Sequence, residues 1–206
     1  MNAQDLYNVL VSQYSHLVCT ICDLHKPCKK VRLCGNESEV GVIDFDKIES
    51  IEAQIAHRSP LPSVDALCAS GSCLCFIEIK GWKKYLEYNT FDEREAMMKA
   101  ESYNLEEKLK HSEDLCMRKL SVEDYGVIDK LFILVSDIDD TENGLDEILY
   151  NLNALAITSN NIYSICSRIS QDVLGRKVNI EHYYTKCGKL DNLLLQIAIK
   201  HPRIVA

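Results

Sequence analysis

The sequence predicts an α/β fold with a mixed central sheet and flanking helices. Residues 73–80 and 131–136 are apolar runs of strand length, and segments with apolar residues at helical spacing lie between the expected strands. Such alternation is typical of α/β sandwiches. The chain has 206 residues, of which 47% are hydrophobic and 26% charged, so it suits one domain with a sizeable core.

The first half of the chain contains two expected helices. Residues 3–18 carry Leu6, Leu10, Tyr14 and Leu17 at helical spacing. A short strand is expected at 40–43, followed by a helix over 44–57 that Asp44 or Asp46 would cap. The residues of this second helix expected to face inward are Ile48, Ile51 and Ile55.

The second half alternates between helical and strand patterns. Residues 91–120 are charge-rich and read as one long helical segment, whereas 131–136 are continuously apolar and read as a buried strand. A helix is expected over 144–156, after the turn signal Asn143-Gly144. A strand over 178–185 and a helix over 190–200 complete the chain.

Between these halves, two apolar runs joined at Gly71-Ser72 predict a β-hairpin with a two-residue turn. The turn fixes the register, and the expected pairs are Ser70 with Cys73, Leu67 with Phe76, and Asp65 with Glu78. One face then carries positions 65, 67, 69, 74, 76, 78 and 80, and the other carries 64, 66, 68, 75, 77 and 79. Since both faces are apolar near the turn, we expect burial on both sides, with charged residues gathered at the far end.

That charged end predicts a metal site. Asp65 and Glu78 would lie opposite each other, about 5 Å apart at Cβ, where two carboxylates repel and burial increases the repulsion. A divalent cation would relieve the repulsion, and Mg²⁺ suits a pair of carboxylates with bound waters. Lys80 projects to the same side and could orient a metal-bound water or stabilise charge on a phosphoryl oxygen. The alternative is a solvated strand end, with Asp65 capping a turn.

The residues around this end also carry a family resemblance. They read Ser63-Val64-Asp65-Ala66-Leu67 and Phe76-Ile77-Glu78-Ile79-Lys80-Gly81-Trp82. Together they resemble the PD-(D/E)XK nuclease superfamily, also called restriction endonuclease-like, whose motif has an Asp on one strand and Glu-x-Lys on the next. Val64 stands where the motif name has Pro. The resemblance spans about residues 40–185.

The resemblance implies a restriction endonuclease-like core and a nuclease that hydrolyses phosphodiester bonds, in DNA above all, with Mg²⁺ or Mn²⁺. Asp65 and Glu78 would bind the ion, the Ile79 carbonyl would add a ligand, and Lys80 would assist the attacking water. It divides the chain into an N-terminal helix and Cys-rich segment at 1–39 and a nuclease-like domain at 40–206. Because such folds also occur without activity, the alternative is a catalytically inactive interaction subunit.

A further acid is expected from the helix at 44–57, again by resemblance. Glu52 is the first candidate, because its spacing places it on the same face as Ile48 and Ile55. Glu49, one turn earlier, is the rival. The alternative for either residue is a surface glutamate.

Three lysines are candidates for contact with nucleic acid. Lys83 and Lys84 follow the motif beside Trp82 and Tyr85, and lysines with aromatic faces suit phosphates and bases. Trp82 could equally belong to the core. Lys108 precedes Ser112 by four residues, so the two could share the helix face over the site, as in small members of the superfamily; a solvated helix face is the alternative.

The chain contains ten cysteines. Cys19, Cys22, Cys28 and Cys34 form the simplest candidate zinc set, with His25 as a substitute ligand. The other six are scattered, which favours buried thiols, and Cys68 and Cys75 are expected to face each other as reduced core residues. We find no cysteine with a helix N-terminus or a histidine at a spacing that indicates a Cys–His hydrolase.

The net charge of the chain and its targeting signals limit the kinds of partner that we expect. The formal net charge is −8, which argues against a protein that coats nucleic acid through bulk positive charge. We therefore expect weak, salt-sensitive binding of DNA by a local basic patch, and a protein partner, such as an ATPase subunit, that delivers the substrate. Small nucleases of this kind resemble components of bacterial anti-phage defence systems. With no secretory signal and no apolar run of membrane length, a cytoplasmic protein without a membrane partner is expected.

Overall fold

The computed structural model describes residues 2–24, 38, 40–119, 125–138 and 156–202, without the side chains of 156–161. Six strands form one mixed sheet in the order β1-β2-β3-β4-β5-β6, antiparallel as far as β4 and parallel from β4 to β6. The strands are β1 (Val18–Thr20), β2 (Gly41–Asp44), β3 (Ala66–Ser70), β4 (Cys73–Lys80), β5 (Asp129–Ser136) and β6 (Glu181–Lys186). The expected α/β class with a mixed central sheet is confirmed.

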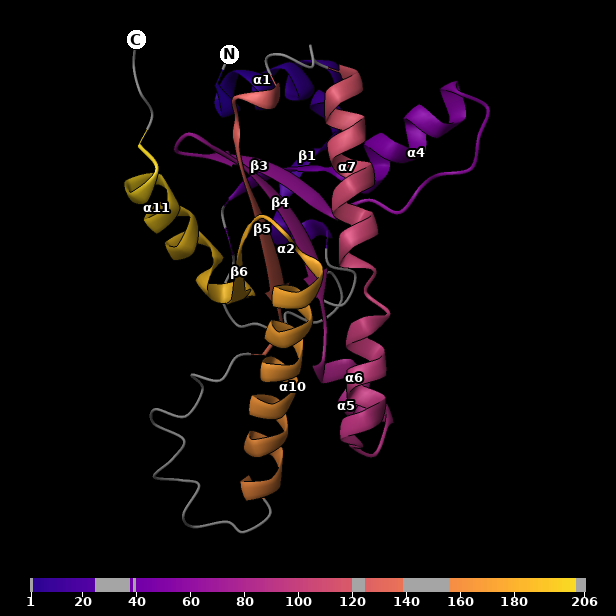
Figure 1. Ribbon diagram of the computed structural model, residues 1–206, viewed down its shortest axis with the longest axis vertical. Coiled ribbons are helices and arrows are strands. Elements are labelled where there is room, and N and C mark those ends of the chain that lie inside the picture. The colour runs from indigo at the N-terminus through magenta and orange to yellow at the C-terminus, as the bar shows by residue number, and fades with distance from the viewer. Residues whose placement is uncertain (1, 25–37, 39, 120–124, 139–155, 203–206) are drawn as a thin grey trace.

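Helices cover both faces of this sheet, as Figure 1 shows with α11 on one side and α7 on the other. The helices are α1 (Ala3–Gln13), α2 (Ile21–Leu24), α4 (Phe45–Ile55), α5 (Lys83–Tyr88), α6 (Glu93–Glu101), α7 (Leu105–Lys119), α10 (Ala156–Lys177) and α11 (Leu190–Lys200), with short 3-10 turns at Ser15–Leu17 and Cys187–Lys189. The structure has two hydrophobic cores, one on each face of the sheet. The first core lies between the sheet and α1, α4, α7 and α10, and the second lies between the sheet and α2 and α11. The layers are therefore helix, sheet, helix.

The β3–β4 hairpin has the expected register, with Leu67 opposite Phe76 and Cys68 opposite Cys75. Its positions also divide between the two cores as expected, because residues two apart on a strand share a face. Val64 is the exception: it joins the first core, because β3 begins only at Ala66 and the chain before it leaves the strand path. The first six residues of β4 are buried, which confirms that this strand is covered on both sides.

Within the expected N-terminal segment 1–39, the described residues 2–24 contribute to the same sheet and core as the rest of the chain. β1 pairs with β2, and Leu6 and Leu10 of α1 belong to the first core. The expected domain boundary at residue 40 stays a prediction. Asp44 caps α4, where its side chain accepts a hydrogen bond from Lys47 N at 3.1 Å. The inward placement of Ile55 was wrong: Ile55 is 69% exposed, because α4 ends there, beyond the sheet (Figure 1).

Several elements differ from the expected ones. Instead of the one helical segment expected over 91–120, the described residues form two helices, α6 and α7, and Asn104, with a φ of 53°, lies between them. Strand β1 and helices α5 and α10 were not expected. The helix expected over 144–156 lies almost entirely outside the described residues. In the described part of the chain, no helix is both long and apolar enough to cross a membrane.

Candidate functional site

The candidate site lies where β4 ends, on the face of the sheet that α7 covers. Glu78 and Lys80 lie within the last three residues of β4, and Asp65 is the residue immediately before β3. The β3–β4 ladder stops at the pair Ala66–Ile77, so Asp65 lies just outside it rather than directly paired with Glu78 as expected. Its carboxylate is nevertheless attached to β4, because Oδ2 accepts a hydrogen bond from Ile79 N at 2.6 Å.

Glu78 is the most unusual residue of the site, because its carboxylate is fully buried (0% exposed). Oε1 contacts the ammonium groups of both Lys80 and Lys108, the latter at 2.7 Å, whereas Oε2 has no hydrogen-bond partner among the described residues. Burial and the negative charge of Asp65 raise the pKa of Glu78 to about 7, although both lysines oppose the rise. A buried carboxylate oxygen without a partner is costly, and a bound cation would satisfy it.

A third carboxylate belongs to the same cluster. Asp46, in the first turn of α4, accepts a hydrogen bond from Ser63 Oγ at 2.5 Å. Burial raises the pKa of Asp46, and the charge of Asp65 adds to this effect, whereas Ser63 and Lys108 lower it. The sequence presented Asp46 only as a possible cap. Because Asp44 caps α4 instead, the Asp46 side chain is available to the site.

Lys108 and Ser112 of α7 both lie over the site, as their spacing allowed. Burial alone would lower the pKa of Lys108, but Glu78, Asp65 and Asp46 together raise it, so this lysine is attracted by all three carboxylates. Ser112 is fully buried, and its Oγ accepts a hydrogen bond from Val64 N at 3.0 Å. That bond fixes the backbone immediately before Asp65.

The structure does not bring Glu52 or Glu49 to this cluster. The Glu52 carboxylate accepts a hydrogen bond from Tyr14 at 2.5 Å and pairs with Lys119 at 2.7 Å. Glu49 pairs with Arg58 at 2.5 Å and accepts from Leu61 N at 2.8 Å. These partners outweigh the effect of burial and lower the pKa of both glutamates. Asp46 therefore occupies the place that we expected Glu52 to take.

The segment that follows β4 is part core and part surface. Trp82 is fully buried, and its Nε1 donates to Ser170 Oγ at 2.9 Å, so it belongs to the core. Asp137 accepts hydrogen bonds from the backbone nitrogens of Trp82 and Lys83 at 2.7 and 3.1 Å, which begins α5. Lys83 is half-buried and Lys84 exposed, so nucleic-acid contact by these lysines stays a prediction.

Two residues that the sequence did not single out extend the site toward α6. Lys80 Nζ lies 5.6 Å from the ring centre of Tyr103, and Lys99 Nζ lies 5.6 Å from the same ring. The Lys99 ammonium also lies 5.0 Å from the Tyr85 ring. Burial and the neighbouring Lys80 lower the pKa of Lys99. Cation–aromatic contacts of this kind hold lysine side chains in place.

The candidate zinc cysteines are only partly described. Cys19 and Cys22 are half-buried, whereas Cys28 and Cys34 lie outside the described residues. Cys68 and Cys75 face each other in the sheet as expected, and neither forms a disulfide. A hydrogen bond with Cys68, together with burial, raises the pKa of the Cys75 thiol well above its usual value, and both side chains are buried.

The chain matches no protein-family model, curated protein or solved structure with which it was compared. The fold is therefore described at the level of the α/β class. The nuclease superfamily and its restriction endonuclease-like core remain predictions that rest on the motif.

Proposed function

We propose that this chain is a metal-dependent nuclease of the PD-(D/E)XK type that hydrolyses phosphodiester bonds, in DNA above all. One observation carries the proposal: the fully buried Glu78 has an unpartnered Oε2 and lies in a cluster with Asp65, Asp46 and two lysines. A purely structural ion pair would satisfy both carboxylate oxygens, whereas a ligand site leaves one available.

The donor set fits Mg²⁺ or Mn²⁺. Carboxylate oxygens are the ligands that these hard cations prefer. Asp65 and Glu78 would hold the ion, the Ile79 carbonyl would add a ligand, and Asp46 replaces Glu52 as the further acid in our proposal. Three carboxylates face only two lysines here, so the cluster keeps an excess of negative charge that favours a cation. When bound, such an ion polarises a phosphoryl oxygen and lowers the pKa of a bound water.

Lys80 is the residue of this chain that we assign to the attacking water. Its side chain is 24% exposed, so its ammonium group can reach a substrate, whereas Glu78 is closed to solvent. A carboxylate that holds a cation needs fewer lysine partners, so Lys80 becomes free to donate a hydrogen bond to the water or to a phosphoryl oxygen. Lys108 remains over the acids and stabilises their ionised forms.

The substrate would be held by a local basic surface. Lys80 and Lys99 both lie 5.6 Å from the centre of the Tyr103 ring, and Lys83 and Lys84 begin the neighbouring α5. With a net charge of −8, the isolated chain should bind DNA weakly and in a salt-dependent manner. A protein partner, such as an ATPase subunit, would supply the remaining affinity. A role in anti-phage defence is compatible with such an assembly.

The test compares cleavage of supercoiled, linear and single-stranded DNA by the purified full chain, with Mg²⁺, Mn²⁺ or EDTA. Asp65→Asn and Lys80→Met should abolish cleavage, and Asp46→Asn should reduce it strongly. Glu52→Gln is the matched control, because Glu52 contacts Tyr14 and Lys119 instead of the cluster. Equal cleavage by all variants, or cleavage that persists in EDTA, would refute the proposal.

The second candidate is a catalytically inactive interaction subunit. It is favoured by one observation: both lysines already neutralise Oε1 of a glutamate that no solvent reaches, as in a structural ion cluster. Calorimetric titration with Mn²⁺ separates the two candidates. Binding that is lost in Asp65→Asn supports the nuclease, whereas no binding, no cleavage and a stable complex with a copurifying protein support the interaction subunit.

A further inference from the structure

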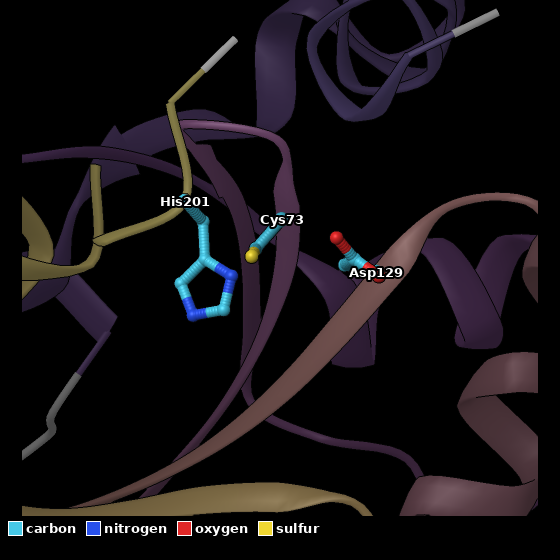
Figure 2. A group of neighbouring side chains, drawn as sticks. All are labelled: Cys73, Asp129 and His201. Atoms are coloured by element: carbon cyan, nitrogen blue, oxygen red, sulfur yellow. The ribbon is translucent and has the colours of Figure 1, made fainter. Parts of the chain in front are cut away.

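A second cluster of metal-ligating side chains lies at the opposite end of β4. Cys73, Asp129 and His201 each offer a ligand atom, and these atoms all lie within 4.8 Å of one another. Figure 2 shows the three side chains converging, with the His201 ring turned toward the Cys73 thiol. Cys73 begins β4 and Glu78 follows five residues later, so about 17 Å of strand separates this cluster from the candidate nuclease site.

We propose that Cys73, Asp129 and His201 form a zinc site that fastens the C-terminal helix α11 to the sheet. Thiolate, imidazole and carboxylate groups are the ligands that Zn²⁺ takes in proteins, and three protein ligands leave a fourth position of the tetrahedron open. A soft thiolate and an imidazole do not suit Mg²⁺ or Ca²⁺. The ligand chemistry of this cluster therefore differs from that of the carboxylate cluster around Glu78.

The backbone holds the three ligands in place before any ion binds. Cys73 and Asp129 are directly paired in the β4–β5 ladder, so they lie side by side at the edge where both strands begin. His201 ends α11, and its carbonyl oxygen accepts a hydrogen bond from Ser72 N at 2.8 Å. The hairpin turn and the end of α11 are thus joined one residue away from Cys73.

Gly71 makes this close approach possible. A Cβ at this position would lie 2.1 Å from His201 O, and the φ of 59° is one that other residues rarely adopt. Ser70 Oγ adds a hydrogen bond to Leu194 O at 2.6 Å, so two residues of the turn region contact α11. The position of His201 relative to Cys73 is therefore determined by main-chain packing and does not depend on a flexible side chain alone.

The polar environment of His201 is that of a metal ligand. Its Nε2 is buried without a hydrogen-bond partner in the described part of the chain, and Glu181 Oε2 lies 3.6 Å away. Metal-binding histidines commonly direct their second ring nitrogen to a carboxylate, which orients the ring. Glu181 is itself held by Tyr183, whose hydroxyl donates to Oε1 at 2.6 Å, and by Lys200. We assign Glu181 as the residue that positions His201.

A cysteine nucleophile explains this cluster less well. A Cys–His pair can form a hydrolase site, but the attacking sulfur must reach a substrate. Cys73 is fully buried, and α11 covers its face of the sheet. Asp129 is exposed, so an ion could enter from that side. A structural site also matches the position, because the cluster joins the end of α11 to the centre of the sheet.

The test measures zinc in the full chain, purified with added Zn²⁺ and then passed through buffer without chelator. We expect one Zn²⁺ per chain by elemental analysis, and a thiolate-to-metal charge-transfer band when Co²⁺ replaces it. Asp129→Asn and His201→Gln should each weaken binding at least tenfold, and Cys73→Ser should abolish the charge-transfer band. Glu181→Gln should preserve that band while weakening binding about tenfold or more.

Two controls keep the result interpretable. Cys22→Ser tests the other candidate zinc cysteines, and Cys68→Ser tests a core thiol outside the cluster; both should keep zinc and the cobalt band from this site. Asp129→Asn alters an exposed residue, so its circular dichroism should match the unmutated chain. The proposal is overturned if the unmutated chain binds no zinc. It is also overturned if Cys73→Ser retains the cobalt band, or if Asp129→Asn and His201→Gln bind zinc as tightly as the unmutated chain.

Discussion

The raised pKa of Glu78 makes a quantitative prediction about stability. In the folded chain this pKa is about 7, against an ordinary value of 4.5. The folded state therefore keeps a proton that the unfolded state has released between these two values. Stability falls with rising pH wherever the folded state binds more protons, so Glu78 lowers stability progressively from about pH 4.5 to about pH 7, and the full loss remains above that range. The difference between these two pKa values corresponds to about 3.4 kcal/mol.

Glu78→Gln removes this titration while keeping the size of the side chain. We expect the unfolding free energy of the unmutated chain to fall by about 2.5 kcal/mol more between pH 5 and pH 8 than that of the variant, because part of the loss has already occurred at pH 5. Urea unfolding, followed by circular dichroism in EDTA, measures both values. Other titrating groups, including Asp46, are present in both proteins and cancel in the difference. Glu106→Gln, at an exposed position on α7, should behave as the unmutated chain.

A cation should change this comparison in a defined way. Mg²⁺ or Mn²⁺ favours the ionised carboxylate, so at pH 8 it should stabilise the unmutated chain and leave Glu78→Gln much less affected. At 100 times the dissociation constant the gain is about 2.7 kcal/mol. The reasoning is refuted if the two proteins lose stability equally between pH 5 and pH 8 in EDTA, because Glu78 would then titrate normally.

Three further substitutions test particular contacts by the same unfolding assay. Gly71→Ala should cost about 1–3 kcal/mol, because it forces a residue with a Cβ into a φ of 59° against His201 O, whereas Gly126→Ala, with open space around it, should be nearly neutral. Ser112→Ala should cost about 1–3 kcal/mol, because the buried Val64 N loses its acceptor; no loss would contradict that role. Lys108→Met removes a cation that lowers the pKa of Glu78, so the pH range over which stability falls should move upward, and an unchanged range would count against the contact.

The hairpin could be predicted because its register and its two faces depend on residues that are close together in the sequence. A glycine at the turn and a side-chain period of two fix which residues pair and which share a face. Those rules gave the pairs Leu67–Phe76 and Cys68–Cys75 and placed Glu78 and Lys80 together, as observed. The position of Lys108 over the site could also be predicted, because its spacing of four residues from Ser112 places both on one face of the helix. The prediction weakened only at Asp65 and Val64, where the chain leaves the strand.

Features that depend on tertiary packing were not predictable. Helix α10 is rich in Ser, Asn and β-branched residues, which are poor helix formers, and it is held by the packing of Cys166, Ile169 and Val173 against the sheet. Spacing along the helix alone could not decide whether Glu52 or Asp46 joins the carboxylate cluster. The direction of α4 relative to β4 decides which acid meets Asp65, and that direction is set by the whole core.

The cluster of Cys73, Asp129 and His201 could not be predicted either, because these residues lie far apart in the sequence and only the folded sheet brings them together.

The position of this cluster on β4 affects how the nuclease assay is interpreted. EDTA would remove ions from both ends of the strand, so loss of cleavage in EDTA does not by itself identify the catalytic ion. Cys73→Ser and Asp65→Asn separate the two effects: the first should lower stability but keep cleavage with Mg²⁺, and the second should lose cleavage but keep zinc. If Cys73→Ser, folded at the assay temperature, also lost cleavage, the two ends of β4 would have to act as one site.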